Sequence, residues 1–314
     1  MTDDGHACVG PTGSGTEGAN VDGTVTWREL LAEAAARLDA AGVSATCDTD
    51  ARRIVAEAAG AADSELFLHL GRPATARGVA RLDEMVARRC AGEPLQYVLG
   101  HWAFRSLDLM VDRRVLIPRP ETEQVVEVAL TELDRLGGSE RPTTVVDLGT
   151  GSGAVALSVA VERVRASVWA TDASADALDV ARANLAGIGR AGARVRIEQG
   201  SWFDALPDML HGSVDLFVSN PPYVATTAEL PSEVVEWEPT GALFSGPDGT
   251  DDLRTILTGA LDWLTGDGVV VCELSPEHAD AVAGLASEHF AETEIVADLT
   301  GRSRMLVARR PGPG

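Results

Sequence analysis

The sequence predicts an α/β protein, a doubly wound and mostly parallel sheet preceded by a small all-helical domain and a β-hairpin linker. Three observations support this fold class. From Thr143 onward, short apolar runs alternate with segments of helical periodicity, a pattern typical of a parallel sheet with helices on both faces. Residues 24–92 show helical periodicity alone. Residues 95–117 change to the alternation of a β-hairpin.

Length and composition bound the class of protein. The chain has 314 residues, enough for two domains of roughly 100–200 residues each. It carries a net charge of −22 and 26 basic residues, all of them arginine, which argues against a stable partnership with nucleic acid. No apolar run reaches the ~18 residues of a membrane helix, and no secretory signal is present. We therefore expect a soluble, cytoplasmic protein without a membrane partner.

The cysteines do not suggest a metal or redox site. Cys8, Cys47, Cys90 and Cys272 are scattered without the spacing of either, so reduced thiols are expected. Residues 1–22 are rich in Gly, Thr and Asp and lack apolar periodicity, which predicts a disordered tail. His6 lies in this tail together with Cys8, and two ligands there do not make a metal site.

A helical domain is predicted over residues 23–92. Its first helix ends at Gly42, and residues 48–60 and 74–92 repeat the helical pattern. Periodicity alone does not choose between a packing module and a module that docks a partner, and we expect substrate docking. The apolar face of the first helix comprises Trp27, Leu30, Leu31, Ala34 and Leu38.

The linker is predicted over residues 93–118 and the α/β domain over 119–314. A helix begins near Pro120, and others are expected in residues 153–164 and 174–187. The last segment, residues 292–310, resembles two further strands, of which one pairs antiparallel at the sheet edge. The five predicted buried strands are residues 143–149, 167–172, 193–200, 214–220 and 268–274.

A glycine-rich turn follows the first of these strands, in "VVDLGTGSGAVAL". Glycines let a ligand approach the backbone, and the helix N-terminus offers free N–H groups; Gly149, Gly151 and Ala154 fit a loose dinucleotide fingerprint. The next strand ends at Asp172, where an acid can accept both hydroxyls of a ribose. The alternative is a tight turn with Asp172 or Ser174 as a helix cap. Turn and acid indicate an adenosine-bearing ligand, either NAD or S-adenosylmethionine, without separating the two.

The stretch "FVSNPPYVAT" distinguishes between these two predicted ligands. A planar NH2 group is a poor nucleophile because its lone pair is delocalised. The Asn220 side-chain oxygen and the Pro221 carbonyl can accept its hydrogens, Pro222 stiffens the loop, and Tyr223 offers a flat face for stacking. A dehydrogenase needs none of these features, whereas methyl transfer to an amide or amino nitrogen does. The alternative is an Asn-Pro turn that ends a strand.

With these motifs in place, the chain resembles the HemK/PrmC family of protein-(glutamine-N5) methyltransferases, which act on peptide chain release factors. The resemblance covers roughly residues 25–310 and implies a Rossmann-like, seven-stranded S-adenosylmethionine-dependent methyltransferase domain. Asn-Pro-Pro-Tyr alone is shared with adenine-N6 DNA methyltransferases. The resemblance rests on "GEPLQYVLGHWAF", "VLIPRPETE", "DLGTGSGAVAL", "SNPPYV", "EPTGALFSGPDGTDDLR" and "GRSRMLVARR".

The resemblance also implies roles for individual residues. It assigns Asp172 to the ribose hydroxyls of S-adenosyl-L-methionine, Trp202 to the adenine side, and Asn220 to both substrate and cofactor. Ser201 stands where many relatives carry an acid. The glycine-rich turn is assigned to the methionine and ribose end of the cofactor through Gly149, Thr150, Gly151, Ser152 and Gly153. The catalytic set is Asn220, Pro221 and Tyr223, and the substrate-binding set is Asn220, Pro221, Pro222 and Tyr223.

The expected reaction is methylation of the glutamine amide nitrogen in the Gly-Gly-Gln loop of release factors. Three alternatives are weighed against it. A ribosomal-protein glutamine methyltransferase shares the chemistry, and an adenine-N6 DNA methyltransferase shares Asn-Pro-Pro-Tyr but needs a basic groove. A non-catalytic nucleotide-binding or docking module is a different class, against which the intact Asn220 and Tyr223 argue.

Overall fold

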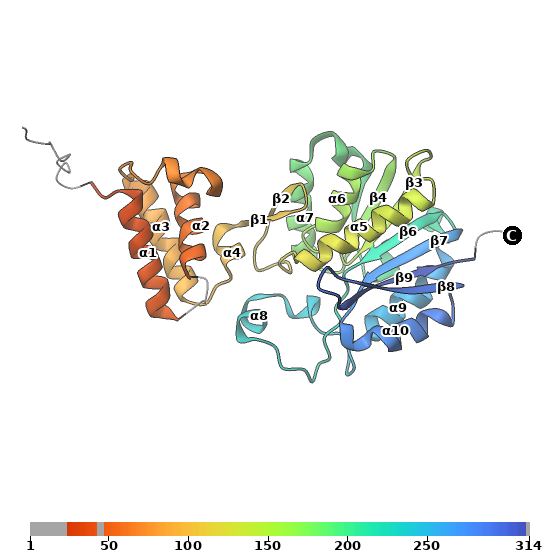
Figure 1. Ribbon diagram of the computed structural model, residues 1–314. Coiled ribbons are helices and arrows are strands. Elements are labelled where there is room, and N and C mark those ends of the chain that lie inside the picture. Colours follow the sequence, from red (N-terminus) through yellow and green to blue (C-terminus); the bar gives the residue numbers. More distant parts are fainter. Residues whose placement is uncertain (1–23, 43–46, 312–314) are drawn as a thin grey trace, which may run out of the picture. The chain divides into compact units, whose positions relative to one another are not determined.

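The computed structural model describes residues 24–42 and 47–311 of the chain. The predicted tail, residues 1–22, lies outside the described residues. The chain divides into two compact units between Cys90 and Ala91, and Figure 1 shows the elements of each. Within the two described ranges, no helix is long and apolar enough to cross a membrane, and no three His, Cys, Asp or Glu side chains gather as metal ligands.

The first unit is helical. Thr26 caps the first helix, with its side chain accepting from the Glu29 backbone N–H, and Gly42 ends that helix with φ 64°. Trp27, Leu30, Ala34 and Leu38 are buried as the periodicity predicts, whereas Leu31 is half-buried. The elements of this unit are α1 (Trp27–Ala41), α2 (Cys47–Ala59), a 3-10 helix (Asp63–Leu68) and α3 (Ala76–Cys90).

The second unit opens with a short helix that the alternation pattern concealed. Residues 95–117 lead to the expectation of a hairpin, but Leu95–Leu99 forms α4, which begins after Pro94 and ends at Gly100 with φ 82°. The hairpin itself is confined to β1 (His101–Phe104) and β2 (Leu107–Met110). A segment of five residues is too short to distinguish the two periods, so the flanking proline and glycine decide the local structure.

A seven-stranded sheet forms the centre of the second unit. Its strand order is β5-β4-β3-β6-β7-β9-β8. Only β9 runs against the other strands; it lies between β7 and the edge strand β8, pairing antiparallel with both. The predicted seven-stranded sheet with an antiparallel pair at one edge is confirmed. The strands are β3 (Thr143–Leu148), β4 (Ala166–Asp172), β5 (Val195–Gln199), β6 (Val214–Ser219), β7 (Leu264–Glu273), β8 (Glu292–Ala297) and β9 (Ser303–Arg309).

Helices cover both faces of this sheet, as Figure 1 shows. Alternate strand residues separate into two cores. Val145 and Val218 pack with α5 and α6 on one face, and Val146 and Phe217 pack with α9 and α10 on the other. The helices of this unit after α4 are α5 (Pro120–Arg135), α6 (Ala154–Glu162), α7 (Ala175–Gly187), α8 (Ser232–Trp237), α9 (Asp251–Gly259) and α10 (Ala279–Ser287).

Candidate functional site

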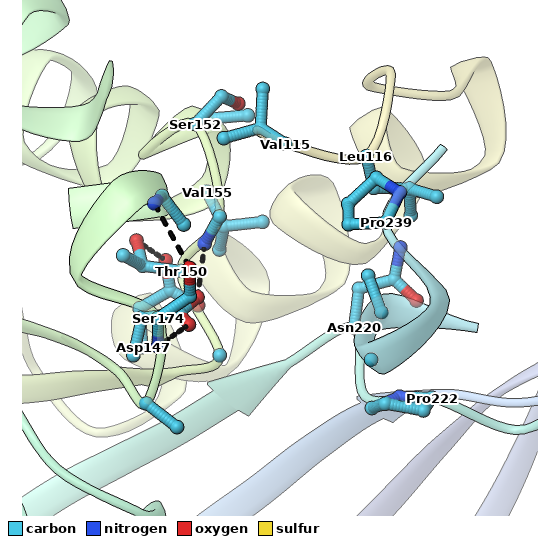
Figure 2. Close-up of a pocket in the computed structure, with 18 of the residues that line it drawn as sticks. Val115, Leu116, Asp147, Thr150, Ser152, Val155, Ser174, Asn220, Pro222 and Pro239 are labelled. Atoms are coloured by element: carbon cyan, nitrogen blue, oxygen red, sulfur yellow. Dashed lines mark hydrogen bonds between the residues drawn. The ribbon is translucent and has the colours of Figure 1, made fainter. Parts of the chain in front are cut away.

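A cavity of about 390 Å³ lies at the carboxyl ends of β3, β4 and β6, within the range of about 300–1,000 Å³ typical of small-molecule sites. In the strand order, β4 and β5 lie on one side of β3, and β6 lies next to β3 on its other side. Doubly wound sheets bind ligands where the strand order reverses in this way. In Figure 2, Asp147, Thr150 and Ser174 lie on one side of the cavity, and Asn220, Pro222 and Pro239 lie on the other.

The glycine-rich turn forms one wall of the cavity. Gly149, Thr150, Gly151 and Ser152 line it. Gly151 has φ 54°, and a Cβ built on it would meet no atom within 4 Å, so its α-carbon faces open space. Gly153 does not line the cavity; a Cβ there would approach the Leu157 side chain to 3.1 Å. The structure thus separates Gly153, which packs against α6, from the other four residues.

Asp172 joins the turn to the end of β4. Its Oδ2 accepts from the Gly151 N–H at 2.9 Å and its Oδ1 accepts from the Ser174 N–H at 2.9 Å. Burial raises the pKa of this carboxyl, and the backbone N–H groups oppose the shift. A carboxylate offers about four acceptor positions, so the contacts to Gly151 and Ser174 leave acceptor capacity for a hydroxyl donor from the cavity. The alternative role of Ser174 is also realised, since its hydroxyl caps α7 by accepting from the Ala177 N–H.

Trp202 and Ser201 line the same side of the cavity. The Trp202 backbone has φ 48°, uncommon for a residue other than glycine. Its ring lies beside Gly149, where a built Cβ would be 3.7 Å from the Trp202 ring edge. The bulky side chain is therefore held against the backbone of the glycine-rich turn.

On the opposite wall, Asn220 and Pro222 line the cavity, whereas Pro221 and Tyr223 do not. The Asn220 amide nitrogen donates to the Thr122 hydroxyl at 3.1 Å. Pro221 is buried, and the Tyr223 hydroxyl donates to Glu273 Oε1 at 3.1 Å. The structure brings Asn220 and Pro222 to the cavity and turns the Tyr223 hydroxyl toward the protein interior.

Thr122, which lines the cavity, and Glu273, which lies behind it, are polar residues to which the sequence patterns assigned no role. Thr122, in the first turn of α5, donates to Glu273 Oε2 at 2.7 Å. Glu273 is 1% exposed at the end of β7. Burial raises the pKa of the Glu273 carboxyl, against the lowering effect of the Thr122 and Tyr223 hydroxyls. The position of Glu273 at the end of a strand, level with Asn220 after the neighbouring strand, is the sequence feature that could have predicted its place beside the site.

Asp147 is a second buried acid that was not assigned a role. It is 1% exposed, lines the cavity, and accepts from the Thr150 hydroxyl at 2.6 Å and the Ala156 N–H at 3.0 Å. Burial raises the pKa of Asp147 to about 7, with a further contribution from the charge of Asp172. This acid links the glycine-rich turn to the start of α6.

The rim of the cavity joins two of the quoted motifs, "VLIPRPETE" and "EPTGAL". The Glu238 carboxylate is buried and accepts from the Ile117 N–H at 3.2 Å and from the Arg119 guanidinium. Pro118 and Pro239 flank this contact and both line the cavity. An ion pair between the buried Glu238 carboxylate and the half-buried Arg119 side chain therefore joins the two motifs at one end of the cavity.

Comparison with known proteins identifies these motifs. Residues 29–100 match the PrmC N-terminal domain, and residues 127–236 match the methyltransferase small domain. The release factor glutamine methyltransferase of Cereibacter sphaeroides is 39% identical over 286 residues, covering 90% of this chain and 98% of that protein. The one from Moorella thermoacetica is 39% identical over 290 residues, covering 91% and 99%.

A solved structure supports the fold alone. The hMettl16 catalytic domain, in complex with MAT2A 3'UTR hairpin 6, superposes with a TM-score of 0.50 at 13% identity, covering 76% of this chain and 82% of that one. These comparisons confirm the predicted methyltransferase fold and enzyme class. The chain belongs to the release factor glutamine methyltransferase family.

Proposed function

We propose that this chain methylates the side-chain amide nitrogen of the glutamine in the Gly-Gly-Gln motif of peptide chain release factors, using S-adenosyl-L-methionine. The observation that carries the chemistry is the orientation of the Asn220 carboxamide. Its NH2 group is engaged by Thr122, which leaves its oxygen as an acceptor for an NH2 group in the cavity. The names of the relatives support a release factor as the substrate.

The cavity residues fit S-adenosyl-L-methionine, which when bound supplies the electrophilic methyl group. Gly149 and Gly151 let a ligand lie against the backbone of the turn. Asp172 keeps acceptor capacity for the ribose hydroxyls, and the Trp202 ring offers an apolar wall for the adenine side. Ser201, at the same edge, supplies a neutral hydroxyl in place of an acid.

On the substrate side, the protein aligns a weak nucleophile. The Asn220 oxygen and the Pro221 carbonyl would each accept one hydrogen of the glutamine NH2 group, which aims the nitrogen and favours its pyramidal form. Fixing the reactants in this way, with hydrogen bonds that strengthen in the transition state, supplies most of the catalysis. The glutamine nitrogen would form a bond to the methyl group as the methyl–sulfur bond breaks, which leaves a neutral thioether. The methylated nitrogen would then lose one proton to water, so the protein needs no general base. Stacking of the substrate on the Tyr223 ring stays a prediction.

The substrate class follows from charge as well as from the site. A net charge of −22 disfavours duplex DNA at physiological salt, although DNA adenine also presents a planar NH2 group. A glutamine of a ribosomal protein presents the same chemistry as that of a release factor, so ribosomal proteins are the second candidate substrates. We propose that the helical first unit adds contacts to a folded protein partner.

Parallel labelling reactions with different substrates test the proposal. Full-length protein is incubated with methyl-labelled S-adenosyl-L-methionine and, separately, with a release factor, the same factor carrying alanine in place of the motif glutamine, a ribosomal protein fraction, and duplex DNA. Label is expected in the first reaction alone. Equal label in the glutamine-free factor, or faster labelling of ribosomal protein or DNA, would contradict the proposed substrate.

A further inference from the structure

Three side chains from distant parts of the sequence form a hydrogen-bonded chain behind Asn220. The Asn220 NH2 group donates to Thr122 Oγ1 at 3.1 Å, across 98 residues of sequence. Thr122 Oγ1 donates to Glu273 Oε2 at 2.7 Å, across 151 residues. Tyr223 occupies the other carboxylate oxygen through its hydroxyl, at 3.1 Å. Thr122 is 4% and Glu273 1% exposed, so bulk water does not compete with these contacts.

The direction of each hydrogen bond in this chain follows from the groups themselves. The Thr122 hydroxyl donates to Glu273 Oε2, and a threonine hydroxyl has only this one proton to donate. Because Glu273 takes that proton, the Thr122 oxygen can act toward Asn220 only as an acceptor. The group that faces Thr122 must therefore be the donor end of the carboxamide, its NH2 group.

The opposite end of the carboxamide then has no choice of orientation. With the NH2 group toward Thr122, the Asn220 oxygen points away from this contact, and Asn220 lines the cavity. The reversed carboxamide has almost the same shape but would present an NH2 group to the substrate NH2 group, donor against donor. Because both orientations have almost the same shape, neighbouring hydrogen-bonding groups must select one of them.

We propose that Thr122 and Glu273 are positioning residues that fix the Asn220 carboxamide with its oxygen toward the substrate. This inference rests on the proposed function, because the oxygen matters only if the substrate group is a hydrogen-bond donor. Tyr223 supports the same arrangement, because its hydroxyl donates to Glu273 Oε1 and Thr122 donates to Glu273 Oε2. The role differs from the stacking role assigned to its ring.

Matched substitutions test the positioning role of Thr122 and Glu273. Thr122→Val removes the hydroxyl at nearly constant shape, Thr122→Ser retains it, and Glu273→Gln replaces one acceptor oxygen by a donor. Loss of the hydroxyl is expected to lower kcat about tenfold, as for one or two hydrogen bonds, while the Kd for S-adenosyl-L-methionine changes less than twofold. Thr122→Ser should restore most of the loss. Thr131→Val is the control, because it lies on the same helix with an exposed hydroxyl bound to the Glu127 carbonyl.

A double-mutant cycle and a ligand-free measurement separate the outcomes. In an Asn220→Ala background, Thr122→Val should lower kcat no further, because Thr122 acts through Asn220; a second tenfold loss would overturn the proposal. In ligand-free full-length protein, NMR should show a contact between the Asn220 NH2 protons and the Thr122 side chain, which Thr122→Ser keeps. If that contact is present but no release factor is methylated, the proposed function fails and the orientation stands. If methylation proceeds and Thr122→Val has wild-type kcat, the positioning role is refuted.

Discussion

Replacing Asp172 by asparagine tests the cofactor side of the site. Asparagine has nearly the same shape but keeps one acceptor oxygen and turns the other position into an NH2 donor. In the structure both Asp172 oxygens accept, one from Gly151 and one from Ser174, each at 2.9 Å. The variant therefore sets a donor against a backbone N–H donor and removes the charge that would face the ribose.

The expected magnitude follows from these contacts. A hydrogen bond to a charged group contributes about 1.5–3 kcal/mol, and one such contribution lost from the bound state weakens affinity roughly 10- to 150-fold. The contact to Gly151 lies within the protein itself, so its loss should lower the thermal stability of the ligand-free protein. The proposed ribose contacts would exist only in the complex, so their loss should appear as weaker binding.

Calorimetry with S-adenosyl-L-methionine and with NAD measures the effect. Asp179→Asn is the matched control, because Asp179 is an exposed acid of α7 paired with Arg182 and does not line the cavity. Wild type and control should bind S-adenosyl-L-methionine and not NAD. Binding by Asp172→Asn within twofold of wild type would refute the ribose role, and NAD binding without S-adenosyl-L-methionine binding would refute the choice of cofactor.

Three further predictions concern the rest of the cavity. Asn220→Ala should lower kcat in single-turnover methylation by about 10²–10³-fold with the fold intact; near-normal kcat in a folded variant would reduce the loop to a turn. Because the folded pKa of Asp147 is raised from 3.8 to about 7, its folded state keeps a proton that the unfolded state releases. Relative to Asp147→Asn, wild type should therefore lose stability as pH rises from about 4 to about 7 and level off above that, as thermal melting would show; a flat difference would contradict the raised pKa. Arg119→Met should cost about 2–3 kcal/mol of unfolding free energy by leaving the buried Glu238 carboxylate unpaired, and adding Glu238→Gln should recover part of it; equal melting of all three proteins would contradict the structural role of this pair.

Periodicity predicts most of the fold because buried parallel strands and their helices have regular patterns. The strand ending at Ser219 and the helix after the glycine-rich turn occur where those patterns place them. Local competition explains the miss at Leu95–Leu99, where one helical turn is shorter than the window that separates the two periods. The position of β9 between β7 and β8 also depends on pairing that no local pattern encodes.

The residues of the candidate site likewise divide into those that local patterns predict and those that depend on tertiary packing. Asp172 and Asn220 were predictable because Asp172 ends β4 and Asn220 follows β6, and the carboxyl ends of these strands reach the same edge of the sheet. Thr122 was not, because it lies in a helix and reaches Asn220 only through the packing of α5 beside β6 and β7. Gly153 and Tyr223 show the converse: each belongs to a motif that reaches the cavity, but its own contacts face the protein.

The site of methylation is the most direct test of the central claim. After reaction with methyl-labelled S-adenosyl-L-methionine, the release factor is digested and its peptides are fragmented in a mass spectrometer. The label is expected on the side-chain nitrogen of the motif glutamine, and it should be lower by about 10²–10³-fold when Asn220→Ala replaces the wild-type enzyme at equal, early reaction times. Label on any other residue, or an unlabelled motif glutamine in a reaction that consumes cofactor, would contradict the account.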